Sequence, residues 1–394
     1  MLIWARLEIA HPFFALRINF NYLFLTPLLL KYSMNVQADQ LLQMTQSILM
    51  AWGMGASDAA ITAGLLVETD LRAIDSHGVS MLPMYEKMVQ QGTLNMRPSR
   101  TYVRDLPAMA LIDADQGLGH PIAREAMLLA CKKAQQNGIA AVGVRNSHHF
   151  GATGLYAEMA SDLGLIGFVT SSTSVPGVIP TNGSTPLLGT NPIAFAAPNR
   201  RNNSFLLDMS TSTVAVNKIK VYEFNDKQLP QGWVVDAQGR AVQDASVALK
   251  LCHEQSGGGI LPLGGNTETG GHKGYGLAVM VQILSSALTG GSFSPTRNSQ
   301  ADKNVAHNIG HFFLAIDPTV FRDLDDFEND VDDVLSVLKK SLPANLNRPV
   351  QVAGDPERAA KALRVTNGIP MSEALLVQLR SIADNAGVEY SLGI

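Results

Sequence analysis

Short apolar segments that follow one another closely limit the fold of this 394-residue chain more than any other feature. Residues 166–171, 193–197 and 205–208 have the composition of strands, and turns rich in Gly, Pro and Asn separate them. Parallel neighbours in a sheet need long crossover connections, usually helical, and strands this closely spaced cannot all be joined in that way. We therefore expect a largely antiparallel sheet in this part of the chain.

An earlier strand–helix–strand pattern over residues 108–144 invites comparison with dinucleotide-binding folds, because Gly117 and Gly119 open its helix. The fingerprint of such folds is incomplete, since Ile122 stands at the third glycine position. The second strand also ends in Arg145 rather than in an acidic residue that would bind a ribose hydroxyl. The sequence therefore does not predict a doubly wound nucleotide fold.

Helical periodicity marks both ends of the chain. Apolar residues recur at helical spacing over residues 38–91, and the chain returns to helix over 321–342 and 356–386. Together with the central strands, this pattern predicts an α/β fold of the α+β kind, with helical N- and C-terminal parts around a mainly antiparallel sheet. A chain of this length with 46% hydrophobic residues is sufficient for two or three domains with buried cores.

Charge and cysteine content exclude several classes of protein. The net charge is −4 and Lys and Arg form no run, so the sequence predicts no nucleic-acid partner. The two cysteines, Cys131 and Cys252, lie outside any CxxC motif, which argues against a disulfide framework and against a cysteine metal site. This usage is typical of the reducing cytosol, and we expect a cytoplasmic protein.

The first 33 residues differ from the rest of the chain. Residues 13–30 are rich in Phe and Leu, and their length would suit a membrane segment or a signal sequence. Arg17 and Pro27 interrupt this stretch, and no clear cleavage site follows it. We therefore interpret residues 1–33 as a non-native or disordered extension, with Met34 as the natural initiator, and expect no membrane anchor and full activity without them.

Polar segments punctuated by glycine recur along the chain. The first, Asp75-Ser76-His77-Gly78, places a histidine just after a helical run, and histidine gives or takes a proton near neutral pH. An isolated histidine of this kind is more often a capping or surface residue. Four further segments follow: RNSHHFG at 145–151, GTNP at 189–192, DMSTS at 208–212 and GGHKGYG at 270–276.

Taken in this order and spacing, the segments resemble the malate/L-lactate dehydrogenase family, also called the type-2 malate/L-sulfolactate dehydrogenases. Ureidoglycolate dehydrogenase, diketogulonate reductase and the reductase of Δ1-piperideine-2-carboxylate are further members. The resemblance runs from about Met34 to the end of the chain and includes GHFFLAID at 310–317 and NGIP at 367–370. It implies a non-Rossmann cofactor domain that is built on a largely antiparallel sheet and binds a nicotinamide dinucleotide, NAD or NADP.

The resemblance also implies a division of the chain. Residues 34–115 and 315–394 would form a helical domain for substrate binding and dimerisation, and residues 116–314 would form the NAD(P)-binding domain. Family members form homodimers with substrate sites near the subunit contact, so we expect a homodimer here. The apolar face of Met81, Met84 and Met88 would lie at this contact, and the active-site cleft would take residues from the partner subunit; without the resemblance, such a face is more often core.

Reduction of a 2-oxo acid needs a hydride donor, a proton donor for the carbonyl oxygen and a group that holds the carboxylate. The resemblance places the family's catalytic histidine on His77, which we take as the proton donor, with Ser76 as its hydrogen-bonding neighbour. Asp208 would orient the imidazole and stabilise its charged form. From the residues alone, an Asx-turn explains Asp208 equally well; the resemblance favours catalysis.

Three further residues are candidates for the substrate pocket. His120 stands at a helix start, a position that lowers the pKa of a histidine and favours its neutral form. Met81 stands where many family members carry an arginine that binds the substrate carboxylate, so a planar two-pronged donor is lost. Arg145 is the candidate that we consider as its replacement.

Candidate cofactor residues lie in the glycine-containing segments. Ser147, His149 and Gly151 occupy a strand-to-helix junction, where free amides and hydroxyls can meet a pyrophosphate. Lys273 precedes a helix in a glycine-rich loop and suits a phosphate or ribose contact, although a plain helix N-terminus explains it too. The resemblance adds Ser172, Ser174, Pro176, Thr190, Asn191, His272 and Gly274.

The sequence predicts no metal site. His148 and His149 are adjacent, so their side chains diverge, and no third ligand has a metal spacing. His307 and His311 are four residues apart, but the strand-like residues after Gly310 argue against a helix that would align them.

These observations predict a NAD(P)-dependent oxidoreductase that interconverts a small 2-hydroxy acid and a 2-oxo acid. Two alternatives stay open. An enzyme of the same family would reduce a cyclic imine such as Δ1-piperideine-2-carboxylate, since the same proton donor serves a C=N bond. The other alternative is a catalytically silent homologue, against which the presence of Ser76, His77 and Asp208 argues.

Overall fold

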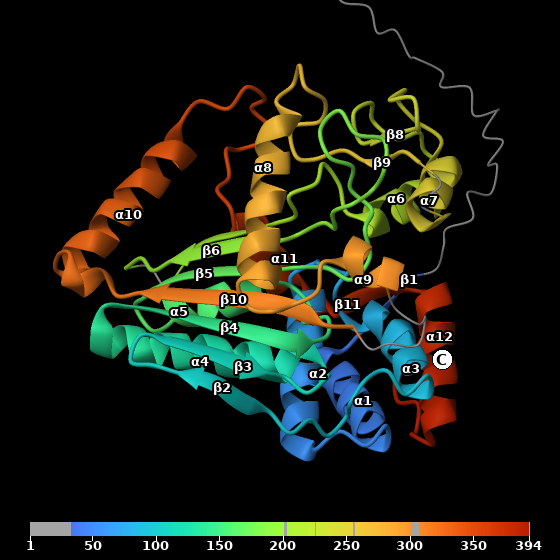
Figure 1. Ribbon diagram of the computed structural model, residues 1–394, viewed down its shortest axis with the longest axis horizontal. Helices are drawn as coiled ribbons and strands as arrows, with labels where there is room; N and C mark the ends of the chain where they lie inside the picture. Colours follow the sequence, from blue (N-terminus) through green and yellow to red (C-terminus); the bar gives the residue numbers. More distant parts are fainter. Residues whose placement is uncertain (1–32, 201–202, 225, 255–256, 301–306, 394) are drawn as a thin grey trace, which may run out of the picture.

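A seven-stranded sheet lies at the centre of the computed structural model of this chain (Figure 1). The structure describes residues 33–200, 203–224, 226–254, 257–300 and 307–393. In sheet order the strands are β2 (Thr101–Asp105), β3 (Met109–Asp113), β4 (Ile139–Ser147), β10 (Ile309–Ile316), β5 (Ile166–Ser171), β6 (Ile193–Ala197) and β7 (Phe205–Met209).

The strand directions confirm the predicted fold class. β3 and β4 run parallel, whereas each of the other neighbouring pairs in this sheet is antiparallel. The parallel pair is joined through α4 (Gly119–Asn137), so the strand–helix–strand unit exists without the dinucleotide fingerprint. β10, which comes from late in the chain, pairs with β4 on one side and with β5 on the other.

Helices cover both faces of the sheet (Figure 1). On one face lie α4 and α5 (Gly154–Ser161); on the other lie α8 (Gly271–Gln282) and the π-helical turn Ile283–Ala287 that continues it. Because strand side chains alternate between the two faces, a shift of one residue would expose the buried set, and burial therefore fixes the register. The core under α4 includes Ile112, Ile122, Met127, Val142 and Phe313.

A separate helical layer packs against one end of the sheet. Its elements are α1 (Ala38–Ala51), α2 (Ala56–Leu71), α3 (Leu82–Gln90) and α12 (Glu373–Ala386), with β1 (Ser33–Val36) paired to β11 (Ile369–Ser372). Its core includes Leu41, Ile48, Leu66, Leu82 and Tyr85.

The methionine-rich face considered as an interface divides between core and surface. Met88 is buried in the core of the helical layer, and Met81 is partly buried against the same core. Met84 is exposed. Most of this face therefore serves the packing of the helical layer.

The remaining elements form two groups. A third core joins α6 (Val216–Phe224), α7 (Ala245–Glu254), β8 (Val234–Val235) and β9 (Gly259–Ile260). The last part of the chain contains α9 (Ser294–Gln300), α10 (Leu324–Lys340) and α11 (Asp355–Asn367). The helix expected over 356–386 is interrupted, because Gly368 adopts a φ of 85° and the chain then pairs as β11 before α12 begins.

The expected boundary at residue 115 does not follow the packing. We assigned residues 34–115 to the helical domain, whereas β2 and β3 extend the central sheet beyond β4. The reason is that β3 buries Ala110 and Ile112 in the core of the sheet. The helical core, by contrast, includes Leu94 and Met96 but none of the residues of these two strands.

The expectation for the N-terminal extension falls mostly on residues 1–32, which lie outside the described residues. Ser33, which was included in that extension, already belongs to β1 and pairs with Ser372. Within the described part of the chain, none of the helices combines the length and the hydropathy needed to cross a membrane.

Candidate active site

Most of the glycine-containing segments meet at one end of the sheet. Register pairs Ser147 with Ile309 and Ser171 with His311, so the ends of β4 and β5 lie beside the start of β10. The pairing of Thr170 with Ile193 adds the start of β6, and β7 ends beside it. The helical layer packs against this end, and the candidate site lies between the two.

A short loop between α2 and α3 carries His77. Its backbone turns sharply, since Ala73 has a φ of 60° and the His77 amide donates to the carbonyl of Ile74 at 2.9 Å. A hydrogen bond of 2.7 Å joins Ser76 Oγ to His77 Nδ1. Within the described residues no hydrogen bond occupies His77 Nε2, so this nitrogen is the one available to a ligand.

Two further histidines and a tyrosine surround the His77 ring. His149 stacks on it, with ring centroids 5.5 Å apart and an interplanar angle of 28°. A hydrogen bond of 2.7 Å joins Tyr85 Oη to His149 Nδ1. His120 meets Tyr85 edge-on at 6.1 Å and His149 at 6.4 Å. We call these four residues the histidine cluster; it joins α3, α4 and the segment after β4 to the His77 loop.

Burial keeps the imidazoles of the histidine cluster neutral near pH 7. Burial lowers the pKa of His77, and it lowers the pKa of His149 further, with the nearby His77 adding to the effect. The pKa of His120 falls to about 3, again mainly through burial. We expected the helix start to lower it; His120 does lie in the first turn of α4, but desolvation is the main cause.

His120 is also short of partners. Both of its ring nitrogens are buried and make no hydrogen bond within the described residues. Gly151, at a φ of 79°, lies so close that an added Cβ would stand 2.8 Å from His120 Nε2. Burying a polar group without a hydrogen-bond partner costs free energy. A polar ligand that reached the His120 ring would supply the missing hydrogen bonds.

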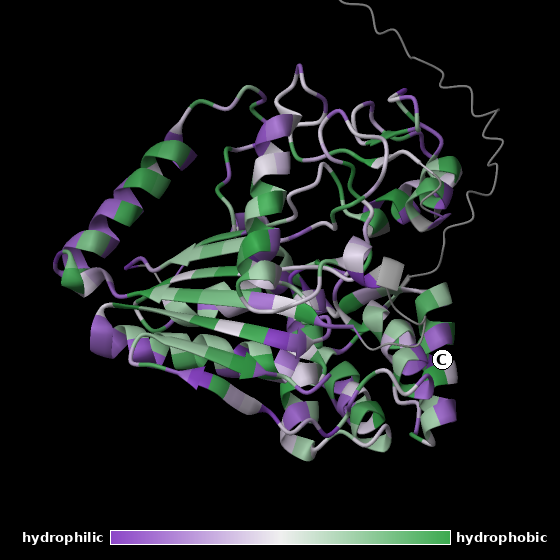
Figure 2. Ribbon diagram, in the orientation of Figure 1, coloured by the Kyte–Doolittle hydropathy of each residue, from purple (hydrophilic) through white to green (hydrophobic). Residues whose placement is uncertain are grey.

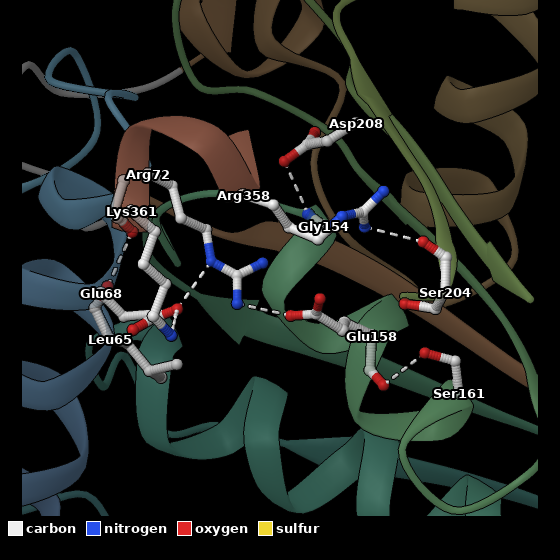
Figure 3. A network of polar contacts seen from close by, with 11 residues as sticks. Leu65, Glu68, Arg72, Gly154, Glu158, Ser161, Ser204, Asp208, Arg358 and Lys361 are labelled. Carbon is white, nitrogen blue, oxygen red and sulfur yellow. Dashed lines mark hydrogen bonds and ion pairs between the residues drawn. The ribbon is translucent and has the colours of Figure 1, made fainter. Parts of the chain in front are cut away.

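Asp208 does not make the expected contact with the imidazole of His77. Its carboxylate accepts a hydrogen bond from the Gly154 amide at 2.7 Å, at the start of α5 (Figure 3). Ser76, and not Asp208, therefore holds the His77 ring. The Asx-turn alternative is not the contact seen either, because Asp208 caps a helix on a different part of the chain.

The carboxyl of Asp208 opens into a cavity of 290 Å³. Desolvation by the surrounding protein atoms raises the pKa of Asp208 to about 6, although the residue is exposed where the cavity opens; the Gly154 amide opposes this shift and the charge of Glu357 adds to it. Arg72 also lines the cavity, but Glu68 and Glu158 hold its guanidinium at 2.7 and 2.6 Å (Figure 3). Asp208 can thus change protonation near neutral pH beside this cavity.

The structure does not bring Arg145 to the histidine cluster. Its Nε donates to the Asp113 carboxylate at 3.1 Å, because the parallel register of β3 and β4 sets these two residues side by side. Its side chain lies next to Gly290. Met81 packs on the helical core. The methionine is uncharged, and the Arg145 guanidinium is held beside Asp113, so neither residue brings a positive charge to the histidine cluster.

Several cofactor candidates brace the end of the sheet. A hydrogen bond of 3.1 Å joins Ser147 Oγ to His311 Nε2, and Ser172 Oγ contacts the backbone of Gly310. Asn191, at a φ of 36°, donates to the carbonyl of Ala278 in α8 at 2.9 Å, while its own Oδ1 is buried without a partner. The carbonyls of Thr190 and Ser174 accept hydrogen bonds from Thr211 and Arg297, and Pro176 is buried.

The glycine-rich loop that leads into α8 lies farther from the end of the sheet than the other cofactor candidates do. His272 and Lys273 are exposed at the first turn of this helix, whereas Asn191 contacts it at Ala278, roughly 10 Å along the axis at 1.5 Å per residue. Gly274 packs on the backbone of Leu263, where an added Cβ would stand 2.2 Å from its carbonyl oxygen. The conformation of the loop thus explains Gly274 without a ligand.

The family model described as malate/L-lactate dehydrogenase matches residues 36–380. The chain belongs to this family. Malate dehydrogenase of Pyrococcus horikoshii is 39% identical over 355 residues, 90% of this chain and 96% of that protein. Its solved structure has a TM-score of 0.80 at 36% identity, covering 91% of this chain and 97% of that one.

Two other solved structures in this family are close in fold. Sulfolactate dehydrogenase of Methanocaldococcus jannaschii has a TM-score of 0.81 at 33% identity, covering 91% of this chain and 98% of that one. Δ1-Piperideine-2-carboxylate reductase of Pseudomonas syringae has a TM-score of 0.74 at 27% identity, covering 89% of this chain and all of that one. The resemblance seen in the motifs is confirmed, and the chain is an oxidoreductase of the malate/L-lactate dehydrogenase family.

Sequence reasoning missed two residues that support the candidate site. Tyr85 was seen only as part of an apolar helix face, although its hydroxyl holds His149; a tyrosine on an otherwise apolar face was the available signal. Asp70, buried beneath the His77 loop, gave no signal, because its position near the end of an amphipathic helix suits a surface carboxylate.

Among the described residues, no group of three or more His, Cys, Asp or Glu could hold a metal ion.

Proposed function

We propose that this chain is a NAD(P)-dependent oxidoreductase that interconverts a 2-hydroxy acid and a 2-oxo acid, with His77 as the proton donor in the direction of reduction. The observation that carries the proposal is the His77 ring, whose Nδ1 is held by Ser76 and whose Nε2 is left for a ligand within the histidine cluster. The names of relatives, malate dehydrogenase and L-sulfolactate dehydrogenase, support the substrate class.

The end of the sheet fits a nicotinamide dinucleotide, which when bound supplies or accepts the hydride. Buried polar atoms there lack partners within the described residues, among them Thr173 Oγ1 and Asn191 Oδ1, and a polar ligand would satisfy them. Gly151 packs against the His120 ring, where an added Cβ would stand 2.8 Å from Nε2, so this ring lies directly beside the backbone that follows β4. Ser172, Thr190 and Asn191 are the residues that we propose to hold the dinucleotide.

The chemistry proposed for the chain is a single proton transfer. In reduction, His77 Nε2 would give a proton to the carbonyl oxygen, and in oxidation it would take a proton from the hydroxyl. Burial lowers the pKa of His77, so the free site holds a neutral ring. A substrate carboxylate beside this ring would stabilise the imidazolium and raise the pKa again. His120 and His149 are the donors proposed to bind that carboxylate, since no arginine stands at Met81.

The experiment that tests this proposal is a substrate panel with both coenzymes. Purified protein is mixed with NADH or NADPH and with one of several 2-oxo acids, including oxaloacetate, pyruvate and sulfopyruvate, and loss of the reduced coenzyme is followed by absorbance. Turnover of at least one 2-oxo acid, and of the matching 2-hydroxy acid in reverse, is expected. Absence of turnover with every acid and either coenzyme would remove the proposal.

The same panel separates the alternatives. The structural likeness to Δ1-piperideine-2-carboxylate reductase keeps a cyclic-imine reductase as the second candidate. Preference for the imine over every 2-oxo acid would select it. Failure with all of these substrates would select the catalytically silent homologue. We propose a cytoplasmic location in each case, on the cysteine usage of the chain.

We also propose a homodimer, with a second copy of the chain on the exposed face of α10. In Figure 1 this helix projects beyond the end of β10, and Figure 2 shows apolar and polar residues alternating along it. Val337 is 70% exposed, and Val334 and Leu338 beside it on the same face are 59% and 49% exposed. Contiguous exposed apolar side chains are typical of protein–protein contacts, and these three form such a group on one face of the helix.

Light scattering is expected to give about twice the chain mass of 42.2 kDa at micromolar concentration. Replacing both Val337 and Leu338 by aspartate places charge in the contact and is expected to shift the mass to that of the monomer. Val377→Asp is the control, because Val377 is 61% exposed on α12, away from the proposed contact. A wild-type monomer, or a double variant that stays dimeric, would contradict the assignment.

A further inference from the structure

We propose that Arg364, on α11, is a positioning residue that fixes the loop of His77 in its catalytic geometry, acting together with the buried Asp70. The inference rests on the proposed function only in giving His77 its role. The two residues hold the loop whether or not His77 gives the proton, and hydrogen–deuterium exchange measures this without a substrate.

Arg364 reaches the His77 loop from a part of the chain almost 300 residues later. Its Nη1 donates to the backbone carbonyl of Asp70 at 2.5 Å and also contacts the Asp75 carboxylate, to which Nη2 donates at 3.2 Å. Only 14% of the Arg364 side chain is exposed. One guanidinium thus joins the end of α2 to the residue two positions before His77, and its planar fork suits this pair of contacts.

Asp70 holds the same loop from inside the molecule. It is 3% exposed, and its Oδ2 accepts a hydrogen bond from the Val79 amide at 2.9 Å. An added Cβ at Gly78 would stand 1.9 Å from Asp70 Oδ1, so the loop rests directly on this carboxyl. Burial raises the pKa of Asp70 to about 8, while the Val79 amide and Arg364 oppose that shift.

His77 lies between these two attachments. Asp75 is held by Arg364 before it, and Gly78 and Val79 are held by Asp70 after it. Displacing a reacting group by about 1 Å can lower a rate by up to a hundredfold. Asp75 is 58% exposed, so its ion pair contributes little to stability, and its main effect should be on geometry.

Helix α11 also supplies a matched control. Lys361, one turn before Arg364, makes an ion pair with Glu68 at 2.6 Å and attaches α11 to α2 without touching the loop (Figure 3). Lys361→Ala removes one cation and one ion pair; Arg364→Ala removes the same and, in addition, the hydrogen bond to the Asp70 carbonyl at the start of the loop. The two variants therefore differ mainly in whether the His77 loop loses its attachment.

Steady-state kinetics on the full-length protein test the proposal. In Arg364→Ala we expect kcat to fall at least about tenfold while the KM for the coenzyme stays within twofold, and in Lys361→Ala we expect wild-type kcat. The two thermal midpoints should agree closely. Arg364→Lys keeps the charge but cannot make the forked contact, and should recover part of kcat. Wild-type kcat in Arg364→Ala, or an equal loss in Lys361→Ala, would overturn the assignment.

Hydrogen–deuterium exchange gives a readout that needs no substrate. Exchange of the peptide that covers residues 74–81 should rise in Arg364→Ala and stay unchanged in Lys361→Ala. If the wild type shows no turnover in the substrate panel, the proposed function fails, yet the exchange comparison still decides whether Arg364 fixes the loop. Unchanged exchange in this peptide would overturn the positioning role whatever the activity.

Discussion

Replacing His77 by alanine is expected to lower kcat by roughly a hundredfold or more, because the carbonyl oxygen loses its proton donor. The affinity for the coenzyme should change little, since the dinucleotide is proposed to bind along the end of the sheet. Steady-state kinetics with the best substrate, together with coenzyme titration by fluorescence, measure the two quantities. His77→Gln keeps a polar side chain without a titratable group and should lose as much.

The pH dependence of the same reaction provides a second check on His77. Reduction uses the protonated ring, so its rate should fall as pH rises through the pKa of His77 in the complex with substrate and coenzyme. Burial lowers this pKa in the free protein, and a bound carboxylate should move it upward. The residual activity of His77→Ala should not show this fall in rate with rising pH. Near-normal turnover in His77→Ala would show that another group gives the proton.

Replacing Gly78 by alanine should damage both activity and stability. The added methyl would stand 1.9 Å from Asp70 Oδ1 and 2.2 Å from its Cγ, and Asp70 is too deeply buried to turn toward solvent. Either the His77 loop or the carboxyl must move, so we expect kcat to fall at least about tenfold and the free energy of unfolding to fall by about 1–3 kcal/mol. Calorimetry and steady-state kinetics measure the two effects.

Gly64 provides the control for this substitution. It lies inside α2, and an added Cβ would meet no heavy atom within 4 Å. Alanine in a helix interior is more favourable than glycine by about 0.5–1 kcal/mol, so Gly64→Ala should raise the thermal midpoint slightly and leave kcat unchanged. Equal behaviour of the Gly64 and Gly78 variants would refute the close contact with Asp70.

Local patterns predicted much of the fold. The spacing of apolar segments between residues 166 and 208 gave an antiparallel sheet, because short connections leave few other arrangements. The missing glycine at Ile122 correctly argued against a Rossmann domain. The domain boundary at residue 115 stays a prediction, and the packing of β2 and β3 on the sheet was not foreseen in it. Whether β2 and β3 join the sheet depends on pairing with β4, and strand composition does not specify its partner.

In the candidate site, too, contacts between neighbours in sequence were predictable and contacts between distant segments were not. Ser76 neighbours His77 in sequence, and its hydrogen bond to the ring was predictable. Asp208 and Arg145 have their partners 54 and 32 residues away, at Gly154 and Asp113, and no spacing rule points to them. His149 was taken as a cofactor residue because of the strand-to-helix junction around it. Its stacking on His77 depends on how the helical layer docks on the sheet, which sequence periodicity does not contain.

The position of β10 sets the order in which this molecule can be completed during its synthesis. β4 and β5 are made early, but the strand that lies between them begins only at Ile309. At about 5–20 residues per second, the ribosome needs on the order of ten seconds to reach β10 after β5. The facing edges of β4 and β5 stay unpaired during that interval, and unpaired edges favour association with other chains. Arg364 emerges later still, so the His77 loop gains its outer attachment only as the last helices of the chain are made.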